Sequence, residues 1–248
     1  MDHQLTVRFR GARRDPELTV VEGFHALKHA LRFGAEVREA VAVDPDRLER
    51  LARELAPDMV GRMASLVSRV DAETLAELVP RPPRTQVAAI ATRPRLDLEA
   101  VLADPAPAPV VLLEDPRNMG NIGACIRVAA AGGAAAVLTT GENDPWYPDA
   151  VRGAAGLHFA LPVGAVERLP ASDRPLLGVD PEGEAVHPAR LPERAVLAFG
   201  TERHGISSEL LRRAEARVAI PMREGVSSLN LATSVAIVLF AMRLGDEP

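Results

Sequence analysis

The most informative hydrophobic pattern lies near the middle of the chain, where a short aliphatic run precedes a polar stretch and a second apolar segment. Val110–Leu113 predicts a buried strand, which ends before Pro116 because proline has no amide hydrogen to give to a strand ladder. The polar residues 118–123 predict a turn, residues 124–131 a helix and residues 134–138 the next strand. This order of strand, loop, helix and strand is typical of an open α/β sheet, in which ligands bind in the loops that follow the strands.

The alternation continues towards the C-terminus. Further strands are predicted at 159–163, 176–179, 196–199 and 217–220, a turn at 180–183, and helices at 151–155, 207–214 and 231–244. The last of these helices is apolar on nearly all sides, which is typical of a helix at the centre of a core or one shared with a partner subunit.

The first third of the chain predicts a separate, small α/β domain. Its predicted elements are helices at 24–33, 45–55 and 72–78 and strands at 37–43, 67–70 and 86–92. A proline-rich stretch then predicts a linker. We therefore expect a domain over residues 1–95, a linker over 96–109 and a second domain over 110–248.

Composition narrows the class of protein. The chain has 248 residues, 47% of them hydrophobic, with a net charge of −5, so a sizeable core is expected and any basic surface must be local. Cys125 is the single cysteine, which excludes an internal disulfide and favours a reducing compartment. No signal peptide, membrane span or metal-ligand spacing is recognisable, so we expect a soluble, cytoplasmic protein without a metal. The arginines of residues 8–14 predict either a phosphate-binding arm or a solvated terminus.

Three polar clusters adjoin the aliphatic strands of the second domain. The first lies within DPRNMGNIGACIR, where Arg127 follows Asn121 by six residues. The second is FGTERHGIS, followed by VAIPM, and the third is SSLN before the apolar helix. If the chain forms one parallel sheet, these clusters meet at the same edge of that sheet.

Taken in order, the three clusters resemble the motifs of the SpoU–TrmH family of knotted RNA ribose methyltransferases. The resemblance covers roughly residues 108–245, and VVEG at 20–23 with TQVAAIA at 85–91 resembles the small substrate-binding domain of many members. It implies a SPOUT-type α/β domain with a deep trefoil knot, preceded by a small α/β domain that binds the RNA substrate. It also implies S-adenosylmethionine as cofactor, a homodimer, and methylation of a ribose 2′-hydroxyl in ribosomal or transfer RNA.

The resemblance also assigns roles to single residues. A guanidinium beside the reacting hydroxyl favours a developing alkoxide, so Arg127 is expected to position and polarise it; arginine stays protonated in proteins, so a role as base needs an unusual environment. Asn121 is expected to orient Arg127 or the ribose, and Glu202 is expected to hold Arg127 or a backbone amide in place. The alternatives are a surface arginine, an Asx-turn and a helix-start carboxylate. The expected catalytic residues are Arg127, Asn121, Glu202, Ser228 and Asn230, and the expected cofactor-binding residues are Gly200, Ile220 and Leu229. Asn118 is the weaker candidate for the asparagine, and His204 is expected to be a solvated loop residue or an RNA contact.

Two other functions remain as alternatives. A dinucleotide-dependent oxidoreductase is disfavoured because Gly120 and Gly123 lack the third glycine of G-x-G-x-x-G, and the following strand ends in threonines rather than in an acidic residue. A non-catalytic RNA-binding module is disfavoured because the motif arginine and the SLN residues are both present. The substrate is expected to be ribosomal rather than transfer RNA, in either a housekeeping or an antibiotic-resistance role.

Overall fold

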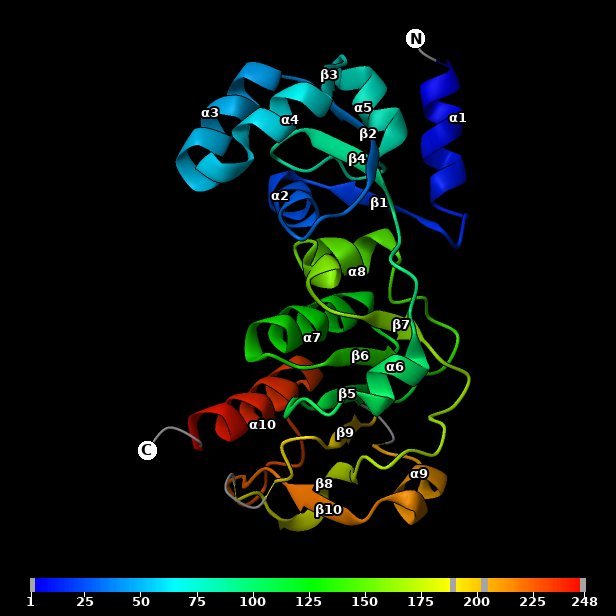
Figure 1. Ribbon diagram of the computed structural model, residues 1–248, viewed down its shortest axis with the longest axis vertical. Coiled ribbons are helices and arrows are strands. Elements are labelled where there is room, and N and C mark those ends of the chain that lie inside the picture. The colour runs from blue at the N-terminus through cyan, green and yellow to red at the C-terminus, as the bar shows by residue number, and fades with distance from the viewer. Residues whose placement is uncertain (1–2, 188–190, 202–204, 246–248) are drawn as a thin grey trace. The chain divides into compact units, whose positions relative to one another are not determined.

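The computed structural model describes residues 3–187, 191–201 and 205–245. The chain forms two compact units (Figure 1). The first comprises Met1–Arg95 with Trp146–Ala160, and the second comprises Leu96–Pro145 with Leu161–Pro248. This division differs from the expected boundaries in two places: the expected linker lies within the second unit, and residues 146–160 belong to the first.

The first unit is built on a four-stranded sheet with the order β1-β4-β2-β3. Strand β4 pairs antiparallel with β1 and β2, and β3 pairs parallel with β2. The strands are β1 (Leu18–Glu22), β2 (Val37–Ala42), β3 (Val67–Arg69) and β4 (Val87–Thr92). The helices are α1 (His3–Ala12), α2 (Phe24–Arg32), α3 (Pro45–Leu55), α4 (Val60–Leu66), α5 (Ala72–Leu78) and α8 (Pro148–Gly153), with 3₁₀ turns at Pro57–Met59 and Leu157–Ala160.

The N-terminal residues form helix α1, where the sequence predicted an arm or a solvated terminus. Leu5, Phe9 and Ala12 recur at helical spacing and are buried, so this helix has an apolar face. In the sequence, the charged residues between these positions hide that pattern. The Arg8 guanidinium binds the Glu39 carboxylate through two nitrogens, at 2.7 and 2.8 Å. That arginine therefore stabilises the fold of the unit.

Residues 146–160 join the first unit through buried polar contacts. The buried Glu22 carboxylate accepts hydrogen bonds from Arg13 at 2.9 Å and from Arg152 at 3.0 Å. The Thr19 hydroxyl donates to the Trp146 carbonyl at 3.1 Å. The predicted strand at 159–163 is wrong in its first half, because Phe159 lies in a 3₁₀ turn and packs edge-to-face on the Trp146 ring. The strand begins only at Val163.

The second unit contains a parallel six-stranded sheet with the order β10-β8-β9-β5-β6-β7 (Figure 1). Its strands are β5 (Val110–Leu113), β6 (Ala136–Thr139), β7 (Val163–Ala165), β8 (Leu176–Ala185), β9 (Val196–Phe199) and β10 (Ala216–Ala219). The central strands are fully buried, as their unbroken aliphatic runs predicted. The predicted turn at 180–183 lies inside β8 as an irregularity, since the pairing with β10 jumps from Gly178 to Glu184.

Helices cover both faces of this sheet. Helices α7 (Met119–Gly132) and α10 (Leu231–Gly245) pack against each other (Figure 1). The close approach uses Gly132, where an added Cβ would lie 3.3 Å from the Leu239 side chain. Helices α6 (Leu98–Ala103) and α9 (Ser208–Arg213) lie on the other face of the sheet. Their Leu102 and Leu210 form a core with the side chains that β5, β6 and β9 direct to that face.

Helix α6 occupies the stretch that the sequence assigned to a linker. Asp97 caps its N-terminus by accepting from the Ala100 amide at 3.0 Å, and Val101 and Leu102 are buried. The carbonyls at its C-terminus have no partner within the helix. Arg174, which is only 3% exposed, donates hydrogen bonds to them. The acceptors of the Arg174 guanidinium are the carbonyl oxygens of Val101, Leu102, Asp104, Ala108 and Arg194, at 2.9–3.4 Å. Burial, together with the neighbouring Arg194, lowers the pKa of Arg174 below its ordinary value.

We expect Arg174→Met to lower the free energy of unfolding by about 3 kcal/mol or more, because it leaves buried carbonyls without a donor. The measurement is urea unfolding followed by circular dichroism. Arg194→Met is the matched control, since Arg194 also donates to carbonyls of this segment but its side chain is 23% exposed, so water can replace it. Equal losses in the two variants would contradict the role given to Arg174.

Candidate active site

A pocket of about 320 Å³ lies in the second unit, where β9 ends and where residues 179–181 leave the sheet. Residues from three parts of the chain that are distant in sequence line it: 179–181, 199–201 with Gly205, and several residues between 220 and 234. Phe199, Ile220 and Met222 supply apolar surface, while Asp180 and Thr201 supply polar groups. A volume near 320 Å³ falls at the lower end of the range of about 300–1,000 Å³ typical of small-molecule sites.

After β9, Thr201 and Gly205 pair antiparallel and so form the base of a hairpin on one side of this pocket. Thr201 and Gly205 exchange two main-chain hydrogen bonds, at 3.1 and 3.0 Å. A Cβ added to Gly200 would lie 1.9 Å from the Gly205 carbonyl carbon, so only glycine fits at position 200. Glu202 and His204, which the sequence singled out, lie outside the described residues.

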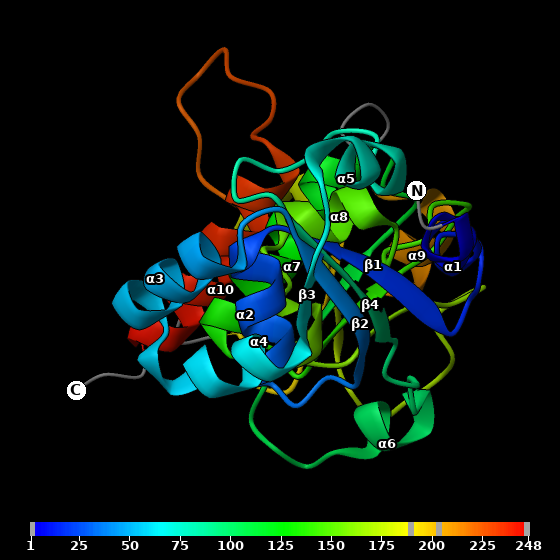
Figure 2. The ribbon, with the colours of Figure 1, turned by 90° about the horizontal axis from the view of Figure 1, so that it is seen from above.

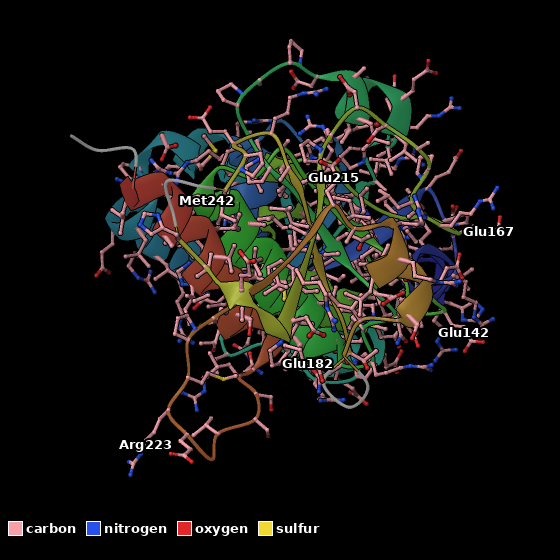
Figure 3. All side chains as sticks on the ribbon, turned by 90° about the horizontal axis from the view of Figure 1, so that it is seen from below. Glu142, Glu167, Glu182, Glu215, Arg223 and Met242 are labelled. Atoms are coloured by element: carbon pink, nitrogen blue, oxygen red, sulfur yellow. The ribbon has the colours of Figure 1, made fainter. Side chains whose placement is uncertain are left out.

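The segment before α10 forms the other side of the pocket. Figure 2 shows residues 221–230 as a loop that projects from the second unit, and Figure 3 shows Arg223 at its tip. Residues 223–230 are exposed, yet Ser227, Ser228 and Leu229 line the pocket. Of the eight expected site residues, Gly200, Ile220, Ser228 and Leu229 therefore lie on its lining.

Two expected residues meet beside this pocket at the first turns of α7 and α10. The Asn230 side-chain amide donates to the Asn121 side-chain oxygen at 3.1 Å, and the Asn230 oxygen accepts from the Ala232 amide at 3.0 Å. The turn predicted at 118–123 is wrong, because α7 begins at Met119. The Asn118 side chain caps the helix by accepting from the Asn121 amide at 3.0 Å. Asn121 is thus a helical residue, and Asn118 has a capping role.

Arg127 lies on the exposed side of α7 and is not among the residues that line the pocket. Six residues along a helix place it about 9 Å further along the axis than Asn121. Within the part of the chain that the structure describes, its guanidinium makes no hydrogen bond or ion pair. The group is therefore available to bind a ligand outside the pocket.

Asp180 is a pocket residue that the sequence reasoning missed. It is the one ionisable side chain among the described residues of the lining, and its Oδ1 accepts from Arg217 at 3.0 Å and from the Glu182 amide at 2.9 Å. The sequence contains an indication of this role, because Asp180 directly follows the aliphatic run of β8. The prediction of a turn at 180–183 accounted for the aspartate without a role in binding.

The described residues contain no group of three or more histidine, cysteine, aspartate or glutamate side chains placed to hold a metal ion. None of the helices that these residues form has the length and apolar character needed to cross a lipid bilayer.

A parallel sheet with a pocket of this size beside the ends of its strands is the arrangement in which α/β proteins bind small molecules. Comparison with known proteins identifies the family. Residues 108–240 match the model of the SpoU rRNA Methylase family, so the chain belongs to that family.

Three similar proteins span nearly the whole chain. The 23S rRNA (adenosine(1067)-2′-O)-methyltransferase of Streptomyces laurentii is 29% identical over 89% of this chain and 83% of its own length. The 23S rRNA (guanosine(2553)-2′-O)-methyltransferase RlmP of Bacillus subtilis is 27% identical over 90% and 88%. The structure of the SpoU methyltransferase AviRb from Streptomyces viridochromogenes, in complex with the cofactor AdoMet, superposes with a TM-score of 0.78 at 26% identity, over 98% of this chain and 97% of that one.

Proposed function

We propose that this protein transfers a methyl group from S-adenosylmethionine to a ribose 2′-hydroxyl of ribosomal RNA. The observation that carries the proposal is the pocket, because Gly200, Ile220, Ser228 and Leu229 converge on it from two separate motifs. The relatives named as 23S rRNA 2′-O-methyltransferases support both the reaction and the substrate class. The AdoMet complex of AviRb supports the cofactor. A role on ribosomes also supports the cytoplasm as the place of action.

The lining of the pocket suits this cofactor. Phe199, Ile220 and Leu229 offer apolar contact to an adenine, and the close backbone at Gly200 and Gly205 offers hydrogen bonds without side-chain bulk. S-adenosylmethionine, when bound, supplies an electrophilic methyl group. The protein's own task is then to orient the two reactants and to assist loss of the hydroxyl proton.

We propose that Arg127 binds the ribose hydroxyl of the RNA. Its guanidinium is exposed and has no partner among the described residues, so it can bind a ribose oxygen or a neighbouring phosphate through two parallel hydrogen bonds. The hydrogen bond between Asn121 and Asn230 holds together the starts of the two helices that flank this side of the site. We assign Asn121, Asn230 and Ser228 to positioning, and we keep Glu202 as a proposed partner of Arg127.

The test is a methyl-transfer assay with the purified protein, radiolabelled S-adenosylmethionine and total RNA from cells that lack the protein. Label in one ribosomal RNA ribose, mapped by comparing RNA from cells with and without the protein, is the expected result. Label in transfer RNA would show that transfer RNA is the substrate. Absence of label with intact cofactor binding would identify a non-catalytic RNA-binding module. Calorimetric binding of NADH in place of S-adenosylmethionine would overturn the cofactor assignment.

We further propose that the second unit contains the trefoil knot of the family. Strand β10 lies at the edge of the sheet beyond β8, whereas the helix that follows it, α10, packs on α7. The connection between them lines the same pocket as residues 179–181 within β8 and the residues that follow β9. These relations support a chain that passes between those two parts of the chain.

We propose that the first unit binds the RNA substrate. Several of its arginines are exposed, whereas the overall net charge is negative, so the basic character is local. The exposed arginines include Arg10, Arg14, Arg47, Arg50, Arg81 and Arg84. We keep the boundary near residue 95 as the limit between the RNA-binding and the methyltransferase domains.

We propose that the protein is a homodimer that associates through α10. Ile237, Phe240 and Leu244 recur at helical spacing and are 37%, 37% and 62% exposed, which forms an apolar stripe on this helix. Val226 and Leu229 add exposed apolar surface in the loop before the helix. A stripe of this kind is typical of a surface that a second protein molecule covers.

We expect the double variant Ile237→Glu/Phe240→Glu to be monomeric, because each carboxylate would have to lose its water in the contact. Light scattering after size-exclusion chromatography measures the mass. Leu55→Glu, which changes an exposed leucine of the first unit, is the control and should leave the mass unchanged. A dimer that survives the double substitution would place the contact elsewhere.

A further inference from the structure

Glu114 binds the far end of the hairpin that lines the pocket. It follows β5 directly, and its carboxylate accepts two hydrogen bonds from one residue, Ser207. Oε2 accepts from the Ser207 amide at 2.7 Å, and Oε1 accepts from the Ser207 hydroxyl at 2.6 Å. Both oxygens of this half-buried carboxylate therefore bind the same residue of the neighbouring chain segment.

The main chain of the same residue holds the near end of that segment. The Glu114 amide donates to the Phe199 carbonyl at 2.8 Å, which extends the pairing between β5 and β9 by one residue. Phe199 and Ser207 flank residues 200–206 on either side. One residue thus binds both ends of the segment, one through its backbone and the other through its side chain.

Three residues between these two anchors form part of the pocket. They are Gly200, Thr201 and Gly205, and Thr201 pairs with Gly205. The two anchors restrict how far the base of this hairpin can open. Hydrogen bonds to an ionised carboxylate are roughly twice as strong as those between neutral groups, so the Glu114 contact is well suited to that purpose.

Ser207 also has a purely local role. Its hydroxyl oxygen accepts from the Leu210 amide at 3.2 Å and so caps α9. That cap uses the serine alone and does not need Glu114. Among the described residues, Glu114 forms no ion pair, and its carboxylate is bound by the two Ser207 donors.

We propose that Glu114 is a positioning residue of the cofactor pocket: by binding Ser207 it holds Gly200, Thr201 and Gly205 in the arrangement that receives S-adenosylmethionine. The cofactor named here rests on the proposed function, whereas the effect on the hairpin does not. Glu114 itself does not line the pocket, so it acts through the segment that it holds.

The test compares Glu114→Ala with Glu114→Gln. We expect Glu114→Ala to raise the Kd for S-adenosylmethionine about tenfold and to raise its KM in parallel, because the hairpin loses bonds to a charged group. The kcat at saturating cofactor should change little. Glu114→Gln should recover most of the affinity, since its amide oxygen can accept from the Ser207 amide and its NH₂ group can donate to the hydroxyl.

Two further measurements separate this role from a loss of folding. Hydrogen exchange needs no cofactor, and the Thr201 and Gly205 amides should exchange about tenfold faster in Glu114→Ala while those of β5 and β9 keep their protection. The control is Glu209→Ala, which removes an exposed carboxylate from the first turn of α9 and should change neither exchange nor Kd.

Each outcome bears on one proposal. Wild-type affinity and unchanged exchange in Glu114→Ala would overturn the inference, and so would equal losses in Glu114→Ala and Glu209→Ala. Should the alanine variant fail to fold, a glutamine variant with normal thermal stability and a Kd raised about tenfold would also overturn it. If the wild-type protein itself binds no S-adenosylmethionine, the proposed function fails, and faster exchange in Glu114→Ala would still support the hairpin anchor.

Discussion

Arg127→Ala is expected to retain nearly normal affinity for S-adenosylmethionine and to lose at least about a hundredfold in the rate of methyl transfer, the size of effect seen when one transition-state donor is removed. The reason is structural: Arg127 lies on the exposed side of α7 and does not line the pocket, so the cofactor does not depend on it. The two measurements are calorimetric titration with the cofactor and radiolabel transfer to ribosomal RNA.

The control for this variant is Arg212→Ala, which removes an exposed arginine of α9 and should keep full activity. Arg127→Lys is also informative, because lysine keeps the charge but cannot form two parallel hydrogen bonds. An Arg127→Ala protein that keeps most of its turnover would show that the guanidinium has no part in the reaction.

Gly200→Ala is expected to weaken cofactor binding by at least about a hundredfold, because overpacking at this point costs several kcal/mol and displaces the pocket wall. The added Cβ would lie 1.9 Å from the Gly205 carbonyl carbon and 2.1 Å from its oxygen. The backbone cannot yield as a flexible side chain would, so the hairpin must open. Calorimetry with S-adenosylmethionine measures the loss.

Gly61→Ala provides the matched control, since an added Cβ there meets nothing within 4 Å. This substitution should leave both affinity and stability near those of the wild type. Normal cofactor binding by Gly200→Ala would mean that the 200–206 segment is not a wall of the binding site.

Most elements of the fold could be predicted from local pattern. Helix α3 matches its predicted range, and β5 and β9 match theirs, because amphipathic spacing and short aliphatic runs are local properties. The misses share a cause. Helices α1 and α6 bury only a few apolar residues among charges and prolines, so their stability comes from surfaces supplied by distant residues such as Arg174. Tertiary contacts of this kind override local propensity.

The site was predicted in part. Motif order pointed to Gly200, Ile220, Ser228 and Leu229, which the structure places on one pocket. Asp180 and Glu114 were missed because each was explained locally, Asp180 as part of a turn and Glu114 as the end of a strand. Their partners lie 37 and 93 positions away in the chain, at Arg217 and Ser207, and no sequence period connects them.

By itself, the sequence determined the alternation of strands and helices, the aliphatic core and the family resemblance, since these follow from side-chain periodicity and from short motifs. Only the tertiary structure decided that Asn121 lies in the first turn of a helix and binds Asn230, that Arg127 lies outside the pocket, and that Glu114 holds both ends of a hairpin. The physical reason is that a hydrogen bond depends on positions in space, and a parallel sheet brings together the ends of strands that the chain keeps far apart.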